Sequence, residues 1–402
     1  MHYLIGTAGH PNVGDELITR TWLRELAERD PDTDVWLDCP NPSGAQALLA
    51  AEHPRLRCVD TLFRLCWEAP SDGPWDVAAF VASALDDHGL APRWIPGLRT
   101  FAAATSVHLL GGGYVNAIWS RHVGLLAAVG WAARRGVRTA VTGQGLAPME
   151  PETGLLVRRL LADVDVVDVR DTASAVLVGR PEALSGDDLW MADLPSLVDT
   201  ARARELDAVV CVQGDLLDVS GDWLTSACLE QLRSWDADPA RTAVVECIPR
   251  VDRAVFDRLR HLVPGLQFVS WLDVVERGLP AADHQRWFSS RFHPHMIAAR
   301  TGARGIAVPV RPGYYDVKHS SLLEVGTGWD VLTPAGVLPA DPRSTAELAV
   351  NAERIRVRKD AIAELLYGAP ALSAVPVPRP RAEEQVRVAV PGPHGTAELS
   401  VG

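Results

Sequence analysis

The sequence has no excess of positive charge. Its 402 residues carry 39 Lys and Arg against 51 Asp and Glu, which gives a formal net charge of −12. Binding to nucleic acid or to an anionic membrane surface needs clustered basic residues, because these release counterions or are drawn to the surface. We therefore expect no nucleic-acid partner, and any anionic ligand must meet a local basic site.

Paired cysteines, a secretion signal and a membrane-spanning run are missing as well. The 6 cysteines form no Cys-x-x-Cys pair, and several lie in apolar runs where a thiol behaves as a small hydrophobe. The start, MHYLIGTAGH, lacks a basic segment followed by a long apolar core, and no run approaches about 18 apolar residues. We expect a cytoplasmic protein without a membrane span; peripheral contact with a lipid-linked acceptor stays open.

The familiar nucleotide and metal motifs are also lacking. The first glycine-rich loop, GTAGHPNVGDELI, is neither a Gly-x-Gly-x-x-Gly fingerprint nor a P-loop, since no Gly-Lys-Ser/Thr follows. The usual support for NAD or ATP binding is therefore lost. No metal cluster of suitable spacing occurs, so we expect no metal ion and no cofactor.

What the sequence does contain is an alternation of short Val-, Ile- and Leu-rich runs with longer helical patterns. This alternation is typical of parallel strands joined by crossover helices and predicts an α/β fold. The helices include DELITRTWLRELAER and GLLAAVGWAARRG. The expected strands are HYLIGTA, TDVWLDC, SVHLLGGG, VRTAVTGQG and VDVVDVRD, then DAVVCVQG, RTAVVECIP, LQFVSWL, WFSSRFH and GIAVPV.

The two series of strands indicate two Rossmann-like lobes, at residues 1–200 and 201–335. Residues 186–205, GDDLWMADLPSLVDTARARE, read as the linker between them. A helix within residues 336–368 is expected to pack across both lobes, and residues 369–402 form a Pro-rich tail. Ligands of doubly wound units bind beyond the carboxyl ends of the strands, so we expect the site in the cleft between the lobes.

The segment SSRFHPHMIAARTG, residues 289–302, holds the first candidate site. If WFSSRFH is a strand, Arg291 and His293 project to the same side, and Pro294 suits the first position of a helix. A helix N-terminus offers free N–H groups and partial positive charge. The Arg291 guanidinium, the His293 imidazole and the helix N-terminus together therefore form an anion site. The alternative is a capping His293 beside a surface ion pair of Arg291. His295, inside the helix, is expected to pack or cap.

Two loops in the first half follow strands in the same way. Arg170 ends the run VDVVDVRD, where an ion pair with Asp171, and Asp171 or Thr172 as a helix cap, are the simpler explanation. In the first loop Asn12 and Asp15 can bind sugar-like hydroxyls, and the alternative is Asp15 as a helix cap.

Glycine turns and one lysine complete the set. The loops HLLGGGYVN and VTGQGLAP allow a ligand to approach the backbone, or merely form tight turns. Lys318 can bind phosphate or stay solvated. All six motifs follow a predicted strand, so they should open on the same edge of their sheets. The candidate donor-binding positions among them are Gly112, Gly113, Gly143, Gln144 and Lys318.

Taken in order, these motifs resemble those of the polysaccharide pyruvyl transferases. The similarity covers roughly residues 3–330 and departs from the family where MADLPSL replaces a simple Asp-Pro. The tail beyond residue 368 has no counterpart. The motifs are Asn-x-Gly-Asp at 12–15, Gly-Gly-Gly at 111–113, Gly-Gln-Gly-x-x-Pro at 143–148, Arg-Asp-x-x-Ser at 170–174, Arg-x-His at 291–293 and Asp-x-Lys at 316–318.

The resemblance implies a fold like that of the GT-B glycosyltransferases and transfer of a pyruvyl group from phosphoenolpyruvate. Two hydroxyls of a sugar or glycan-like acceptor would take up the group as a cyclic ketal, with release of phosphate. By analogy with the family, Arg170, Arg291, His293 and Lys318 are the donor-binding and catalytic positions. From the chemistry of proton delivery to the donor, we expect His293 to act as general acid and then as base. Phosphoenolpyruvate is then a substrate and not a cofactor.

Two other functions fit parts of the sequence. A GT-B glycosyltransferase that uses a nucleotide sugar would need the same lobes and cations, with Glu324 binding the ribose hydroxyls. A catalytically silent binding protein of the same fold is the second. The retained charges of Arg170, Arg291, His293 and Lys318 argue against it. No motif indicates which acceptor is used or which oligomer forms.

Overall fold

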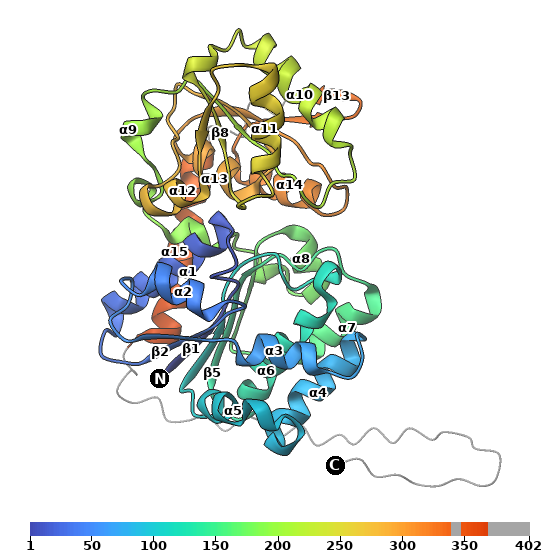
Figure 1. The fold of residues 1–402 in the computed structure, drawn as a ribbon. Helices are drawn as coiled ribbons and strands as arrows, with labels where there is room; N and C mark the ends of the chain where they lie inside the picture. Colours follow the sequence, from blue (N-terminus) through green and yellow to red (C-terminus); the bar gives the residue numbers. More distant parts are fainter. Residues whose placement is uncertain (339–346, 369–402) are drawn as a thin grey trace, which may run out of the picture. The chain divides into compact units, whose positions relative to one another are not determined.

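Two sheets come from separate halves of the chain, as Figure 1 shows for the computed structural model, which describes residues 1–338 and 347–368. The strands of the first sheet lie within residues 2–169 and those of the second within residues 208–338. The expected lobe boundary near residue 200 falls between them. The predicted tail, 369–402, and part of the predicted segment 336–368 lie outside the described residues.

The first sheet is parallel and, within the described residues, has six strands in the order β3-β2-β1-β4-β5-β6. The order reverses between β1 and β4, and this reversal is the switch point at which doubly wound folds bind ligands. β1 and β4 are buried along their whole length, as central parallel strands should be. The strands are β1 (His2–Ile5), β2 (Val35–Asp38), β3 (Leu56–Val59), β4 (Ser106–Leu109), β5 (Arg138–Gln144) and β6 (Val166–Val169).

The second sheet repeats the same winding. Its described strands follow the order β9-β8-β7-β10-β11-β12-β13, so its switch point lies between β7 and β10. Only β13 runs antiparallel to its neighbour among these strands. The strands are β7 (Ala208–Cys211), β8 (Thr242–Val245), β9 (Gln267–Val269), β10 (Arg286–Ser289), β11 (Arg304–Ala307), β12 (Asp330–Thr333) and β13 (Gly336–Leu338).

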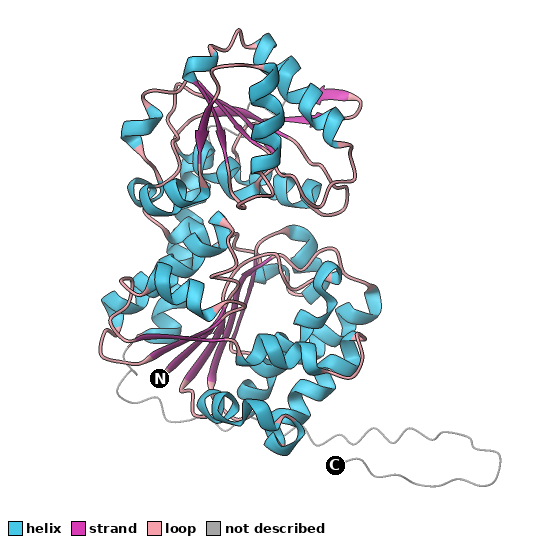
Figure 2. Cartoon of the chain, in the orientation of Figure 1, coloured by secondary structure: helices cyan, strands magenta, loops and turns pink. Residues whose placement is uncertain are grey.

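Helices flank both sheets (Figure 2). We call the first sheet with α1–α8 the N-terminal lobe and the second sheet with α9–α14 the C-terminal lobe. The helices are α1 (Val13–Arg29), α2 (Pro42–Leu49), α3 (Thr61–Glu68), α4 (Pro74–Asp86), α5 (Ile95–Ala102), α6 (Val123–Arg134), α7 (Pro151–Leu160), α8 (Thr172–Val178), α9 (Thr200–Ala203), α10 (Gly221–Ser234), α11 (Arg253–Leu262), α12 (Trp271–Arg277), α13 (Phe292–Arg300), α14 (Tyr315–Val325) and α15 (Leu348–Tyr367).

One hydrophobic cluster is shared by the two lobes. It runs from Trp22 of α1 through Trp190 to Trp287 of β10, all three of which are buried. The late helix α15 joins it with Ile362 and Leu366. α15 contacts α1 and β5 of the N-terminal lobe and also α14 of the C-terminal lobe. The lobes are therefore packed on a common core.

The structure corrects the prediction that WFSSRFH is one strand. β10 ends at Ser289, and α13 begins at Phe292, so Arg291 is the helix cap and His293 lies in the first helical turn. The Ser289 hydroxyl accepts a hydrogen bond from the Arg291 N–H at 3.1 Å and turns the chain out of the sheet. LQFVSWL is shortened in the same way, because Ser270 and Asp273 form a capping box that starts α12.

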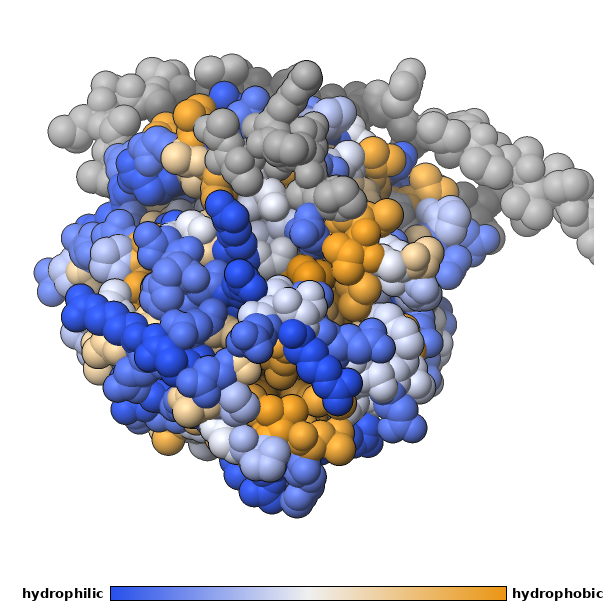
Figure 3. All heavy atoms as spheres, turned by 90° about the horizontal axis from the view of Figure 1, so that it is seen from above, coloured by the Kyte–Doolittle hydropathy of each residue, from blue (hydrophilic) through white to orange (hydrophobic). Residues whose placement is uncertain are grey.

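The surface gives no single dominant apolar area on the face seen from above. Figure 3 shows hydrophilic residues interspersed with hydrophobic ones there, which is ordinary for a folded chain. Among the described residues, no helix combines the length and the apolar character that crossing a membrane requires.

Candidate active site

Residues of both lobes line one cavity of about 360 Å³. This volume suits a small-molecule ligand. Its walls come from loops that follow β1, β4 and β6 in one lobe and β7, β8, β10 and β11 in the other. The carboxyl ends of the strands therefore meet here, at both switch points. Of the predicted site residues, Asn12, Asp15, Gly113, Arg170, Arg291, His293 and Lys318 line the cavity.

Three predicted donor-binding positions lie behind the cavity wall instead. Gly112 and Gly143 have φ values of 148° and 53°, in the region that favours glycine. A Cβ on Gly143 would lie 2.5 Å from a carboxylate oxygen of Asp188. The Gln144 amide nitrogen donates to the Leu110 carbonyl, while its amide oxygen is buried without a hydrogen-bond partner. These residues build the turn that supports Gly113 and do not reach the cavity.

Arg170 and Lys318 form a buried cationic pair at Gly113. Their exposed fractions are 4% and 9%. A Cβ on Gly113 would lie 3.2 Å from the Lys318 ammonium and 3.3 Å from an Arg170 nitrogen, so both charged groups converge on this glycine. In the described part of the chain, no ion pair within 4.0 Å neutralises Lys318, whose ammonium instead lies 3.7 Å from the Tyr314 ring centroid. Burial, with Arg170 nearby, holds the pKa of Lys318 well below its ordinary value.

The carboxylates near Arg170 are too distant for good hydrogen bonds. Its Nε lies 3.6 Å from Asp171, and its Nη1 lies 3.7 Å from Asp187. The Nε is buried without a hydrogen-bond partner. The predicted cap is also present, because Asp171 accepts from the Ser174 N–H at 2.8 Å. Arg170 therefore keeps donor capacity for an anion.

Arg291 is held differently, since it is hydrogen-bonded to the buried Asp252 and to the partly exposed Asp215. Its Nε donates to Asp252 at 3.2 Å, and its Nη2 donates to Asp252 and also to Asp215, at 3.1 Å. Despite its burial, Asp252 raises the pKa of Arg291 above the ordinary value. The alternative of an ion pair at the surface is wrong, because the ion pair exists but its carboxylate, that of Asp252, is only 1% exposed. Arg291 lines the cavity with much of its donor capacity already used.

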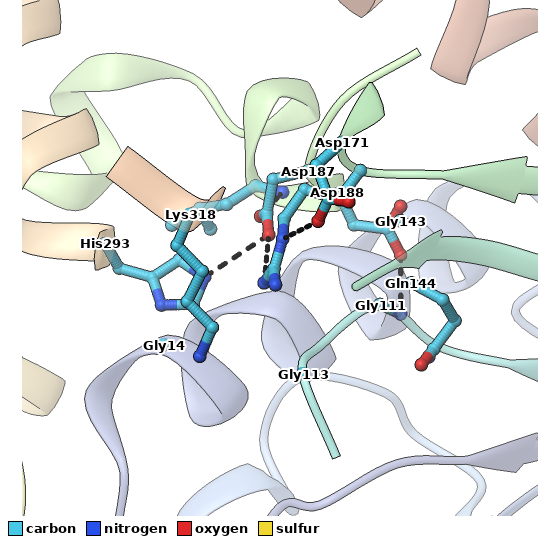
Figure 4. A network of polar contacts seen from close by, with 12 residues as sticks. Gly14, Gly111, Gly113, Gly143, Gln144, Asp171, Asp187, Asp188, His293 and Lys318 are labelled. Atoms are coloured by element: carbon cyan, nitrogen blue, oxygen red, sulfur yellow. Dashed lines mark hydrogen bonds and ion pairs between the residues drawn. The ribbon is translucent and has the colours of Figure 1, made fainter. Parts of the chain in front are cut away.

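His293 reaches from the C-terminal lobe into the N-terminal lobe, as Figure 4 shows beside Gly14 and Asp187. Its Nε2 lies 3.5 Å from the Asp187 carboxylate; neither atom has a hydrogen-bond partner, and the same carboxylate oxygen lies 3.7 Å from Arg170. A Cβ on Gly14 would lie 1.8 Å from Nδ1, so only glycine leaves room for the ring. Burial acts to raise the pKa of Asp187, but His293 and Arg170 lower it to about 2. An ionised carboxylate therefore faces the imidazole.

Asp187 and Asp188 were missed by the sequence analysis, which placed them in a linker. Asp188 is fully buried and accepts from the Gly111 N–H and the Trp22 indole, both at 2.8 Å. The Lys359 ammonium of α15 donates to Asp188 at 2.8 Å and also pairs with Asp168. Two adjacent acids before the apolar run Leu-Trp-Met were the available signal. The MADLPSL segment, noted as a departure from the family, lies four residues further on.

The first loop contributes one cap and one carboxylate. Asn12, and not Asp15, caps α1 by accepting from the Gly14 N–H at 3.1 Å. Asp15 lies in the first turn of α1 and lines the cavity. Burial raises the pKa of Asp15, and His293 partly opposes this. Its carboxyl group is placed to accept hydrogen bonds from ligand hydroxyls.

His295 packs in the C-terminal lobe and does not line the cavity. It is fully buried, stacks on Trp329 with ring centroids 4.1 Å apart, and contacts His319 at 3.0 Å. Within residues 1–338 and 347–368, no three His, Cys, Asp or Glu side chains are grouped so as to hold a metal ion.

Comparison with known sequences finds a family similarity in the N-terminal half of the chain. Residues 12–179 match the family model of the polysaccharide pyruvyl transferases. The resemblance seen in the motifs is thus confirmed for a stretch that contains Asn12, Asp15, Gly113 and Arg170. The remaining pyruvyl transferase-like positions, Arg291-x-His293 and Lys318, lie beyond this match. No curated protein matches the chain in sequence.

Solved structures with a similar fold are GT-B enzymes. A UDP-N-acetylglucosamine 2-epimerase, 11% identical, matches with a TM-score of 0.51 over 93% of this chain and 97% of that one. UDP-GlcNAc 2-epimerase from Neisseria meningitidis bound to UDP-GlcNAc follows with 10% identity, a TM-score of 0.49, and coverage of 91% and 94%. Os79 from O. sativa in complex with UDP and deoxynivalenol-3-glucoside has 13% identity, a TM-score of 0.46, and coverage of 90% and 100%. The first match confirms the predicted fold of two Rossmann-like lobes and carries no information on substrate.

Proposed function

We propose that this chain is a transferase that moves a pyruvyl group from phosphoenolpyruvate to two hydroxyls of a sugar or glycan-like acceptor. The observation that carries the proposal is the pair of buried basic groups, Arg170 and Lys318, which converge on Gly113 in a protein of net charge −12. A bound anion would favour the charged form of Lys318 that burial disfavours. Phosphoenolpyruvate bears a phosphate and a carboxylate. A planar guanidinium fork and an ammonium point charge match these two groups.

His293 supplies the proton in this proposal. Protonation of the methylene carbon of phosphoenolpyruvate leaves the neighbouring carbon oxocarbenium-like, and an acceptor hydroxyl adds to it. The proton of that hydroxyl returns to the imidazole. Phosphate then leaves, and the second acceptor hydroxyl closes the ketal with loss of its own proton. General acid catalysis of this kind is typically worth about 10²- to 10⁴-fold in rate.

Asp187 and Gly14 set the position of the His293 ring from two sides. The Asp187 carboxylate lies 3.5 Å from Nε2 and stabilises the imidazolium. Gly14 leaves space for the ring where any side chain would collide with it. Asp187 acts through His293 and is therefore a positioning residue.

The rival nucleotide-sugar function lacks its proposed ribose ligand. Glu324 accepts a hydrogen bond from Thr172 at 3.0 Å and does not line the cavity. Lys318, which has no ion pair among the described residues, and the loosely paired Arg170 favour an anion but do not require a nucleoside.

The deciding experiment incubates the full chain with phosphoenolpyruvate and a panel of sugar acceptors, and follows phosphate release and product mass. We expect acceptor-dependent release of phosphate and a product heavier than the acceptor by pyruvate less one water. Lys318→Met should weaken phosphoenolpyruvate binding, whereas the same change at the exposed Arg304, outside the cavity, should not. Turnover of UDP- or GDP-sugars without turnover of phosphoenolpyruvate would contradict the proposal.

A further inference from the structure

The cavity changes character from its floor to its mouth. The floor carries the buried cations Arg170 and Lys318, which are 4% and 9% exposed. At the opposite extreme of burial, Trp67 lines the same cavity while 62% of its surface is exposed. A large exposed aromatic side chain beside a ligand cavity is characteristic of a binding surface.

Trp67 belongs to an aromatic wall contributed by the N-terminal lobe. Phe63 precedes it by four residues on α3, so the two rings lie on the same face of that helix. Phe63 is 3% exposed and also lines the cavity. Further along the wall, Trp119 meets Tyr314 of the C-terminal lobe edge to face, with ring centroids 6.3 Å apart. The wall thus leads from the mouth towards the tyrosine beside Lys318.

The charges around the mouth are already neutralised. Arg64, which lines the cavity, donates to Asp60 at 2.9 Å. Arg121 lies over the Trp67 ring at 5.4 Å and forms an ion pair with Asp72. Each of these two arginines therefore has a carboxylate partner, and the mouth offers the part of the Trp67 ring that Arg121 does not cover. Among the described arginines and lysines that line the cavity, those without a hydrogen-bonded carboxylate are Arg170 and Lys318 at the floor, where the proposed donor would bind.

We propose that the mouth is an aglycone site, which binds a flat aromatic group attached to a neutral acceptor sugar. The aglycone stacks on Trp67 beside Phe63, and the hydroxyls of the sugar meet Asn12 and Asp15 further in. The assignment of the sugar and donor subsites rests on the proposed function. The preference for an uncharged aromatic aglycone rests on the mouth alone.

The test compares two glycosides of the same sugar. Binding of 4-nitrophenyl and methyl β-glycosides of galactose, glucose and mannose is measured by calorimetry without donor. We expect the nitrophenyl glycoside of the preferred sugar to bind about three- to tenfold more tightly, the range that an aromatic contact supplies. Trp67→Ala should remove this preference. Because Trp67 is largely exposed, its truncation leaves the core intact.

Trp75→Ala is the matched control, since Trp75 is also an exposed tryptophan, 43% accessible, but lies outside the cavity. It should keep the preference. Failure of all six glycosides to bind, equal affinity for each pair, or a preference that survives in Trp67→Ala would overturn the aglycone site. Phosphate release from phosphoenolpyruvate is measured separately. If that reaction is absent while the Trp67-dependent preference remains, the proposed function fails and the aglycone site stands.

Discussion

The two buried arginines of the cavity are set in opposite ways by the two lobes. In the C-terminal lobe, Arg291 is hydrogen-bonded to Asp252, a carboxylate that also accepts from the Cys247 and Ile248 N–H groups at 3.0 Å. In the N-terminal lobe, Arg170 lies 3.6 and 3.7 Å from its carboxylates. A fully matched ion pair is part of the framework, whereas a loosely matched one retains attraction for a ligand. Arginine therefore belongs to the framework in the C-terminal lobe and is available to bind a ligand in the N-terminal lobe.

The largest expected effect comes from the residue that connects the two halves. His293→Ala should lower turnover by about 10²- to 10⁴-fold, because it removes the proposed proton donor. Steady-state kinetics and circular dichroism check this, with an unchanged spectrum expected. His261→Ala, on the exposed face of α11, is the control and should retain full turnover. Near-normal turnover of His293→Ala would remove the histidine from the mechanism.

Substituting each arginine tests the comparison directly. Arg291→Met should lower the free energy of unfolding by about 3–5 kcal/mol, because it leaves the buried Asp252 without its partner. Arg170→Met should cost less stability but should weaken phosphoenolpyruvate binding more. Urea unfolding and calorimetric titration with phosphoenolpyruvate measure the two quantities. If Arg170→Met lost more stability and Arg291→Met lost more affinity for phosphoenolpyruvate, Arg170 would be the framework residue and Arg291 the donor-binding one.

Asp187→Asn tests whether the N-terminal lobe positions the histidine of the other lobe. We expect kcat to fall by about ten- to a hundredfold, as for a misplaced catalytic group, with a smaller change in the KM for the donor. The folded pKa of Asp187 is lowered to about 2 from 3.8. Its ionised form therefore adds stability that is present above pH 3.8 and is lost as the pH falls towards 2.

Acid unfolding supplies a second measurement for Asp187. The wild type should lose more stability between pH 4 and pH 2 than Asp187→Asn, because only the wild type has this carboxylate to protonate. Equal kcat values for the two proteins would leave Asp187 with a purely structural role.

Glu16 is a carboxylate that lacks the support given to Asp252. Glu16 is fully buried, accepts from the Gly9 N–H at 2.8 Å, and has one oxygen without a partner. Burial raises its pKa from 4.5 to about 8. The folded state binds this proton more tightly than the unfolded state, so stability should fall as the pH rises from 4.5 to 8. Glu16→Gln should flatten this slope in urea unfolding.

Glu28→Gln is the control for that experiment, because Glu28 is exposed on the same helix. It should leave the slope unchanged. A wild-type protein that gains stability over the same pH range, with no change of slope in Glu16→Gln, would show that the Glu16 carboxylate is ionised at little cost.

The sequence predicted the framework of the site because the relevant signals are local. Apolar runs such as HYLIGTA and VDVVDVRD mark buried parallel strands, and parallel strands bring the loops after them to one edge. Asn12, Arg170 and Arg291 were therefore placed in one cavity from strand positions alone. The end of β10 was misplaced because a single serine hydroxyl, that of Ser289, decides it.

The pairing of charges was beyond the reach of local patterns. Asp252 lies 39 residues from Arg291 in the sequence, and nothing in either segment names the other as partner. Asp187 was assigned to a linker because burial of a carboxylate depends on side chains that arrive from elsewhere. The division of labour between Arg170 and Arg291 became visible only with the distances.

The late position of Lys359 in the sequence has a consequence for folding during synthesis. Asp168 and Asp188 are buried in the N-terminal lobe, yet their shared cation follows Asp188 by 171 residues. Buried carboxylates without a counterion are strongly destabilising. During synthesis both carboxylates emerge from the ribosome before the cation that pairs with them, and we expect the N-terminal lobe to gain its full stability after α15 has been translated.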